Sequence, residues 1–229
     1  STDPRRQKAN PAMALPKSVS YPMPTDLPES TVDWTIDPRR AVLLVHDMQE
    51  YFVRAFDRTA DPLATVVPNI DTIRQSAYEA GIPVVYTAQP GDQDPAERAL
   101  LTDFWGPGLA DDPALTSVVA ELAPREDDVQ LTKWRYSAFI RTDLRERMHA
   151  WGRDQLVVTG VYAHIGCLST ALDGFMRDVQ VFVVADGVAD FSRREHTEAL
   201  QYLAARCAAV VPAADAVRRL RTGALSVSG

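Results

Sequence analysis

The fold is decided by the stretch "DQLVVTGVYAHIGCLSTALDGFMRD", residues 154–178. Its first part, 154–161, is short, apolar and rich in β-branched residues, as a buried strand is. Its last part, 167–178, has the apolar spacing of a helix. A strand that leads directly into a helix is half of the repeating unit of an α/β protein. The junction carries Cys167, and because a helix N-terminus can activate a thiol, the stretch also raises the question of a cysteine nucleophile.

The same alternation of strand and helix runs through most of the chain. Apolar, β-branched runs predict six strands, at residues 40–48, 82–89, 129–134, 154–161, 179–186 and 207–212. Helical patterns lie between and after them, at residues 63–80, 112–122, 143–151, 167–178, 193–206 and 213–221. Continuous apolar runs are typical of strands covered on both faces. We therefore predict a doubly wound α/β fold, a three-layer sandwich with a mostly parallel sheet of about six strands flanked by helices.

The N-terminal part of the chain has a different composition. Residues 1–36 are rich in proline and polar residues, which predicts an extended arm, partly disordered before about Leu15. Residues 37–222 are expected to form a single domain, with residues 223–229 as a C-terminal tail.

The composition excludes several classes of function. The net charge is −7 and no stripe of lysines and arginines appears, so nucleic acid is not expected as a partner. There is no run of ~18 apolar residues for a membrane span and no apolar signal-peptide core, so we expect a cytoplasmic protein. The two cysteines are too few for a disulfide framework, which favours a reducing compartment.

The ends of the predicted strands define a candidate site, because ligands of doubly wound folds lie beyond the carboxyl ends of the strands. The sequence places these residues there: His46, Asp47, Gln89, Lys133, 162–166 and Asp186. A single carboxylate can cap a turn, and a single lysine is usually solvated. An acid and a cation at the ends of two strands of one sheet, Asp47 and Lys133, instead favour a catalytic site. The segment 90–110 is long enough to cover it.

Neither a metal nor a cofactor is expected. The four histidines, His46, His149, His164 and His196, are scattered and show no metal-binding spacing. The chain also has no phosphate-binding glycine motif. We expect His46 to be packed or hydrogen-bonded at its strand end, and Asp186 to accept hydrogen bonds from backbone N–H groups in a loop.

Several longer motifs are jointly specific. They are "LLVHDMQEYF" (43–52), "YTAQPG" (86–91), "ERALLTDFWGPGL" (97–109), "TKWRYSAF" (132–139), "GVYAHIGCL" (160–168) and "VADGVADFSRREH" (184–196). Together they resemble the isochorismatase subgroup of the isochorismatase-like hydrolases, and the resemblance covers about residues 16–212.

The resemblance bears on the cysteine. Cysteine hydrolases of the wider superfamily carry their nucleophile at the position of Gly166, one residue before Cys167. The metal-binding histidines of nicotinamidases are also missing. Cys167 is therefore expected to be a small packing residue rather than a nucleophile.

The resemblance implies hydrolysis of the enolpyruvyl ether of isochorismate without a cysteine nucleophile. Protonation of the terminal methylene gives an oxocarbenium ion, water adds, and the hemiketal collapses to pyruvate and a dihydrodiol. Asp47 would be the general acid, Lys133 would bind Asp47 or the enolpyruvyl carboxylate, and Gly166 would leave space and backbone N–H groups. The expected ligand contacts are Gln89, Arg98, Tyr136 and Tyr162, with Phe52 and Trp105 as an apolar wall. A nearby lysine lowers the pKa of a carboxyl whereas an acid catalyst must be protonated, and this tension stays open at the level of sequence.

Alternatives remain. The same reaction on 2-amino-2-deoxyisochorismate, for phenazine or antibiotic synthesis, is the nearest, and a cysteine-dependent amidase or a non-catalytic partner of a carrier protein is more distant. The expected partners are a small dianionic substrate and a second copy of the chain in a dimer, with a carrier protein left open.

Overall fold

The structure, a computed structural model, describes residues 15–226. Its centre is a six-stranded sheet in which all neighbours pair in parallel, as predicted. The strands are β1 (Ala41–His46), β2 (Val84–Ala88), β3 (Val129–Thr132), β4 (Gln155–Val161), β5 (Gln180–Ala189) and β6 (Ala208–Val211). Their order is β3-β2-β1-β4-β5-β6. The chain thus builds outward from β1 to one edge and from β4 to the other, so the switch point of the sheet lies between β1 and β4.

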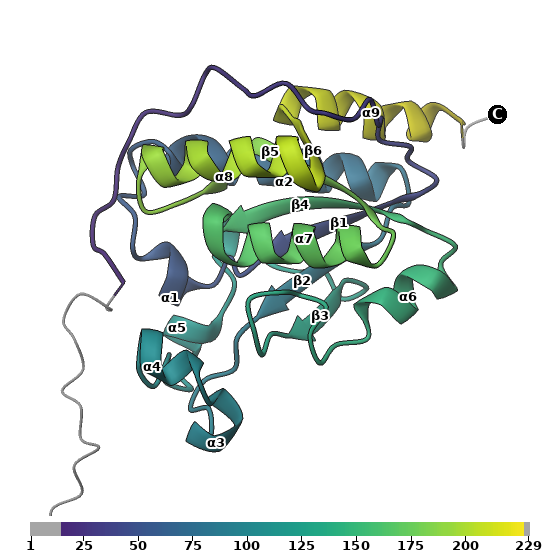
Figure 1. The fold of residues 1–229 in the computed structure, drawn as a ribbon. Coiled ribbons are helices and arrows are strands. Elements are labelled where there is room, and N and C mark those ends of the chain that lie inside the picture. The colour runs from purple at the N-terminus through teal and green to yellow at the C-terminus, as the bar shows by residue number, and fades with distance from the viewer. Residues whose placement is uncertain (1–14, 227–229) are drawn as a thin grey trace, which may run out of the picture.

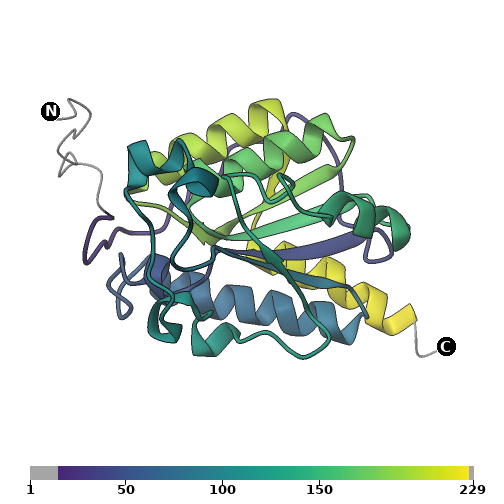
Figure 2. The same ribbon diagram turned by 90° about the horizontal axis from the view of Figure 1, so that it is seen from below.

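Helices cover both faces of the sheet (Figure 1 and Figure 2). One face carries α2 (Leu63–Glu79) and α9 (Ala213–Ser226), and the other carries α6 (Leu144–Ala150), α7 (Leu168–Met176) and α8 (Arg193–Arg206). The alternation along β1 explains the two layers, because Leu43 and Val45 join the core under α2, whereas Val42 and Leu44 join the core under α7 and α8. Each such buried aliphatic side chain stabilises the fold by ~1.5–3 kcal/mol.

One predicted helix is wrong. Only short helices lie between β1 and α2 and between β2 and β3. They are α1 (Glu50–Val53), α3 (Pro95–Arg98), α4 (Leu101–Trp105), α5 (Pro113–Thr116) and the 3₁₀ turn η2 (Ala120–Leu122). The pattern at 112–122 predicts one continuous helix, but the backbone is extended at Ser117 and Val119. There Glu50 N donates to Ser117 O at 2.8 Å and Val119 N donates to Met48 O at 2.9 Å. These tertiary hydrogen bonds replace the helical ones that the segment would otherwise make.

Residues 15–36 lie along the outside of the domain (Figure 1). Val19 pairs with Phe56 in an isolated parallel bridge, and the buried Tyr21 donates its backbone N–H to Asp61 O at 2.9 Å. Leu15 packs against the core under α2. The disorder predicted before Leu15 falls on residues 1–14, outside the described residues. Helix α9 continues to Ser226, into the predicted tail, and residues 227–229 are also outside.

Within residues 15–226, no helix is long and apolar enough to cross a membrane.

Candidate active site

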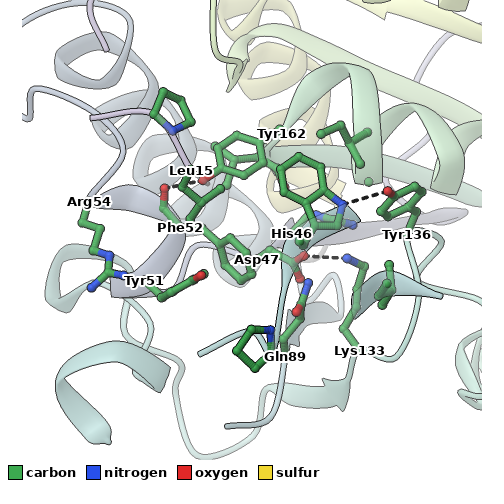
Figure 3. A pocket seen from close by; sticks show the side chains of 18 of the residues that line it. Leu15, His46, Asp47, Tyr51, Phe52, Arg54, Gln89, Lys133, Tyr136 and Tyr162 are labelled. Atoms are coloured by element: carbon green, nitrogen blue, oxygen red, sulfur yellow. Dashed lines mark hydrogen bonds and ion pairs between the residues drawn. The ribbon is translucent and has the colours of Figure 1, made fainter. Parts of the chain in front are cut away.

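A cavity of about 610 Å³ opens at the carboxyl ends of β1 and β4, at the switch point of the sheet (Figure 3). This volume is in the range of small-molecule sites. The cavity is lined by every residue for which the sequence predicts a catalytic or binding role: Asp47, Lys133, Gly166, Gln89, Arg98, Tyr136, Tyr162, Phe52 and Trp105. Residues from the ends of β1 to β4, from α1 and from the segment 90–110 therefore meet at one place.

Asp47 and Lys133 form a buried ion pair at the floor of the cavity. The Nζ atom of Lys133 donates to Oδ2 of Asp47 at 2.5 Å, and Oγ1 of Thr87 donates to Oδ1 at 2.8 Å. The φ angle of Asp47 is +52°, a left-handed conformation that is uncommon for a residue with a side chain and is often found at functional sites. The two residues that the sequence placed at the ends of two strands of one sheet are thus in direct contact across the intervening β2.

The surroundings of Asp47 act on its pKa in opposite directions. Burial raises the pKa, but the neighbouring His46 and Lys133 and the hydrogen bonds from Lys133 and Thr87 outweigh burial and leave it below its ordinary value. The carboxyl is therefore ionised at neutral pH when no ligand is bound. Asp47 can donate a proton only if a ligand changes this balance.

Gly166 and His46 are in contact at the wall of the cavity. Gly166 lies in a π-helical turn, η3 (Ala163–Cys167), which joins β4 to α7. A Cβ atom on Gly166 would lie 2.2 Å from Cε1 and 2.8 Å from Nε2 of His46, so no side chain fits there unless the imidazole moves. The sequence predicts open space beside this glycine, whereas in the structure the ring of His46 fills it.

The imidazole of His46 is fully buried and hydrogen-bonded, as predicted. Its Nδ1 atom lies 2.7 Å from the carbonyl oxygen of Val161. Burial lowers the pKa of His46 to about 4, so the ring is neutral at neutral pH.

Cys167 is a packing residue, which confirms the prediction. It is fully buried in the apolar core under α7 and α8 and is not part of the cavity wall. Burial raises the pKa of its thiol well above the ordinary value. A protonated and enclosed thiol is a poor nucleophile.

Asp190 anchors the turn that carries Gly166, and the sequence did not single it out. The buried carboxylate of Asp190 accepts a hydrogen bond from His164 N at 2.7 Å and lies 2.6 Å from Nδ1 of the same histidine. The backbone N–H of Asp190 donates to the hydroxyl of Tyr21 at 2.8 Å. The N-terminal arm is thereby linked to the wall of the cavity.

Asp190 was missed because β5 is longer than predicted. The strand continues to Ala189 beyond a register shift between Val158 and Gly160 of β4, so Asp190 follows its carboxyl end and Asp186 lies within it. Asp186 accepts a hydrogen bond from Ala213 N at 2.6 Å, as predicted, but it lies within β5 and not in a loop. The motif at 184–196 contained Asp190, but the predicted strand end drew attention to Asp186.

Arg98 is a buried cation that lines the cavity. Its Nε atom donates to Gly106 O at 2.6 Å, whereas its buried Nη1 atom has no hydrogen-bond partner in the structure. Gln89 is held close by through its backbone, because Gln49 Oε1 accepts from Gln89 N at 2.7 Å. A guanidinium with an unused donor at a cavity wall suits a carboxylate.

Aromatic side chains form much of the remaining wall (Figure 3). Trp105 Nε1 donates to the hydroxyl of Tyr136 at 2.9 Å, and the hydroxyl of Tyr162 donates to Phe52 O at 2.7 Å. Tyr162 therefore offers a ligand its ring rather than its hydroxyl hydrogen.

Two further cations at the rim, Lys17 and Arg54, were not predicted. Both side chains are exposed, and Figure 3 shows Arg54 on the same side of the cavity as Leu15, opposite Lys133. The guanidinium of Arg54 lies 4.5 Å from the ring centre of Tyr51, and neither cation is paired with a carboxylate of the described residues. Lys17 belongs to the arm, where the sequence has no strand or helix pattern from which its position could be inferred.

The arrangement suits proton transfer to a bound anion. It combines a buried carboxyl, several cations and a largely aromatic wall, while the nearest thiol is enclosed in the core. Among residues 15–226, no three His, Cys, Asp or Glu residues gather closely enough to hold a metal ion.

Comparisons with known proteins show which family this chain resembles. A family model described as "Isochorismatase domain" matches residues 41–215. The chain is 56% identical over 201 residues to "Isochorismatase" of Bacillus subtilis (strain 168), covering 87% of this chain but 64% of that protein. It is 51% identical over 206 residues to "Phenazine biosynthesis protein PhzD" of Pseudomonas fluorescens, covering 89% of this chain and 98% of that protein. Among solved structures, a cysteine hydrolase from Pseudomonas syringae pv. phaseolicola 1448A superimposes with a TM-score of 0.74 at 25% identity, covering 88% of this chain and 100% of the other.

Proposed function

Because this chain belongs to the isochorismatase family, we propose that it hydrolyses the enolpyruvyl ether of isochorismate to pyruvate and a 2,3-dihydro-2,3-dihydroxybenzoate. One observation carries the proposal. The floor of the cavity offers an acid paired with a lysine, Asp47 and Lys133, while the nearest thiol, Cys167, is buried in the core. An amide requires a nucleophile, whereas a vinyl ether requires a proton.

Asp47 is proposed as the general acid. Its pKa is low without a ligand because His46, Lys133 and the hydrogen bonds from Lys133 and Thr87 outweigh the effect of burial. A substrate carboxylate that contacts Lys133 would weaken this compensation, and the aromatic wall would exclude water. Both changes raise the pKa of Asp47, so that it is protonated when the methylene lies beside it.

The cations suggest how a dianion lies in the cavity. The methylene must reach the floor, so the enolpyruvyl carboxylate would lie near Lys133 and the unused Nη1 donor of Arg98. The ring would then remain nearer the rim, where Lys17 and Arg54 can bind its carboxylate. Gln89, Tyr136 and Tyr162 would complete the contacts, with Phe52 and Trp105 as the apolar wall.

The reaction on 2-amino-2-deoxyisochorismate is the second candidate. The likeness to the phenazine biosynthesis protein favours it, since that match covers 98% of the relative. The match to the Bacillus isochorismatase covers less than two thirds of that protein. A cysteine-dependent amidase is disfavoured because Cys167 is enclosed in the core. The dimer, the carrier-protein partner and the cytoplasmic location stay predictions.

The test is pyruvate release from each of the two substrates by the purified protein, followed with lactate dehydrogenase. We expect pyruvate from at least one, and the higher kcat/KM identifies the ring substituent. Inactivity of a folded protein on both would contradict the proposal.

A further inference from the structure

His46 presents an unused hydrogen-bonding atom at the wall of the cavity. In the described part of the chain, the buried side-chain atoms without a partner are His46 Nε2, Gln93 Oε1, Arg98 Nη1, Thr102 Oγ1 and Arg145 Nη1. Of these residues, His46 and Arg98 line the cavity. A buried polar atom without a partner is costly, so each of the two is expected to gain one during the reaction.

The hydrogen-bonding state of His46 follows from its other nitrogen. Nδ1 lies 2.7 Å from Val161 O, and a carbonyl oxygen only accepts, so Nδ1 carries the hydrogen. In the neutral ring Nε2 is then an acceptor with a lone pair. The groups that surround the ring are Asp47, whose Oδ2 lies 3.7 Å from Nδ1, Lys133, and the backbone carbonyl of Tyr136.

The ring also occupies the place of a side chain at position 166. A Cβ atom on Gly166 would be 2.8 Å from Nε2, so a nucleophilic side chain there and the imidazole exclude each other. The wall of the cavity therefore holds a basic nitrogen where a side chain at position 166 would otherwise lie.

We propose that His46 is a second catalytic residue, the base that receives a proton from the water that adds to the oxocarbenium ion. This inference rests on the proposed function. Asp47 protonates the methylene carbon, which becomes a methyl group. The oxygen of water then bonds to the former vinyl carbon, and one of its protons passes to Nε2 of His46.

Collapse of the hemiketal returns both groups to their starting states. The bond between the former vinyl carbon and the ring oxygen breaks as the carbonyl of pyruvate forms. The ring oxygen takes the proton from His46, and the hemiketal hydroxyl proton passes to Asp47. The sum is one ether and one water in, and one pyruvate and one diol out.

A weak base is sufficient for this step. Burial lowers the pKa of His46 to about 4, so the ring is neutral and able to accept at neutral pH. Water bonded to an oxocarbenium carbon is a strong acid and does not need a stronger base. The imidazolium that forms is correspondingly acidic, which suits protonation of the leaving ring oxygen.

The test measures deuterium in recovered isochorismate after incubation in D₂O. His46→Asn keeps an N–H near the position of Nδ1 but removes the acceptor at Nε2. We expect kcat to fall by ~10² or more, the scale of general acid–base catalysis. Because protonation by Asp47 is then reversed before water adds, the recovered substrate should carry deuterium in its methylene. Asp47→Asn should lose turnover without deuterium, and the exposed His149→Asn on α6 should match the native protein.

The outcomes separate the two claims. If the native protein releases no pyruvate from either substrate, the proposed function fails. If the native protein is active but folded His46→Asn keeps its rate, or loses its rate without deuterium incorporation, only the role of His46 fails. His46→Gln, which places an amide near Nε2, replaces the asparagine variant if that variant does not fold.

The pH dependence of kcat in the unmodified protein is an independent test of the role of His46. As pH falls through a pKa of about 4, His46 becomes protonated, and kcat should fall although Asp47 becomes more fully protonated. A kcat that keeps rising in acid, with circular dichroism unchanged, would overturn the proposal.

Discussion

The Nζ atom of Lys133 lies 2.5 Å from Oδ2 of Asp47, and both side chains are almost completely buried. Such a pair is stable only while both charges are present, since removal of one leaves the other buried without compensation. Together with His46 and Thr87, the lysine thus keeps the carboxyl ionised in the protein without a ligand. A substrate carboxylate that competes for the lysine would raise the pKa of Asp47, and this competition couples substrate binding to proton donation.

Replacement of Asp47 or of Lys133 should separate substrate binding from proton donation. Asp47→Asn preserves shape and cannot supply the proton, so kcat should fall by ~10² or more, while dianion binding survives because a repelling charge is gone. Lys133→Ala should weaken both binding and turnover. Steady-state kinetics and direct titration with product distinguish these results, and a near-native rate for Asp47→Asn would exclude it as the acid.

The pH profiles of kcat and kcat/KM should differ. Catalysis needs protonated Asp47, and its pKa in the unliganded protein is below the ordinary value. The ratio kcat/KM reports the free protein and should therefore decline as pH rises from an already low pKa. In the complex the pKa is raised, so the decline in kcat should begin at higher pH. Coincident declines would show that the substrate does not raise the pKa of Asp47.

Substitutions at positions 166 and 167, which are neighbours in η3, should have opposite effects on activity. Gly166→Ala forces a Cβ atom to within 2.2 Å of His46 Cε1, so it should abolish most activity and destabilise the fold by ~1–3 kcal/mol. Cys167→Ala, its matched control, should keep most activity, and thiol alkylation of the native protein should inhibit little. Thermal unfolding and pyruvate release measure both effects. Loss of turnover by orders of magnitude in folded Cys167→Ala would refute a mechanism without a thiol.

The exposed cation Lys17 at the rim of the cavity should affect substrate binding rather than the chemical step. Lys17→Gln is expected to raise KM about fivefold with kcat nearly unchanged, because an exposed ion pair contributes at most ~1 kcal/mol. Arg39→Gln changes the net charge equally but removes an exposed cation paired with Asp37. If both variants raise KM alike, the effect of Lys17 comes from net charge and not from contact with the ring carboxylate.

Much of this site follows from strand ends in the sequence. Asp47, Gln89 and Lys133 were found because short apolar runs reveal where parallel strands stop, and such ends converge at the switch point. Lys17 and Asp190 were not found, because the arm has no periodic pattern and β5 extends beyond its apolar run.

The surroundings of Gly166 could not be predicted from the sequence, because they depend on a contact between distant residues. The family resemblance aligned Gly166 with the position of a nucleophile and predicted open space there. The structure shows that the ring of His46 fills this space. The helix predicted at 112–122 failed for a related reason, since its backbone hydrogen bonds go to residues 48–50, which are distant in sequence.

The central claim is that the ether is opened by protonation of carbon and not by attack on the ring, and turnover in ¹⁸O-water tests it most directly. If Asp47 protonates the methylene, water bonds to the former vinyl carbon and the ring keeps its own oxygen. Mass spectrometry of the dihydrodiol should then show no ¹⁸O, whereas pyruvate exchanges its carbonyl oxygen with solvent and is uninformative. A dihydrodiol with ¹⁸O at the cleaved position would contradict the account and make Asp47 a base that directs water at the ring.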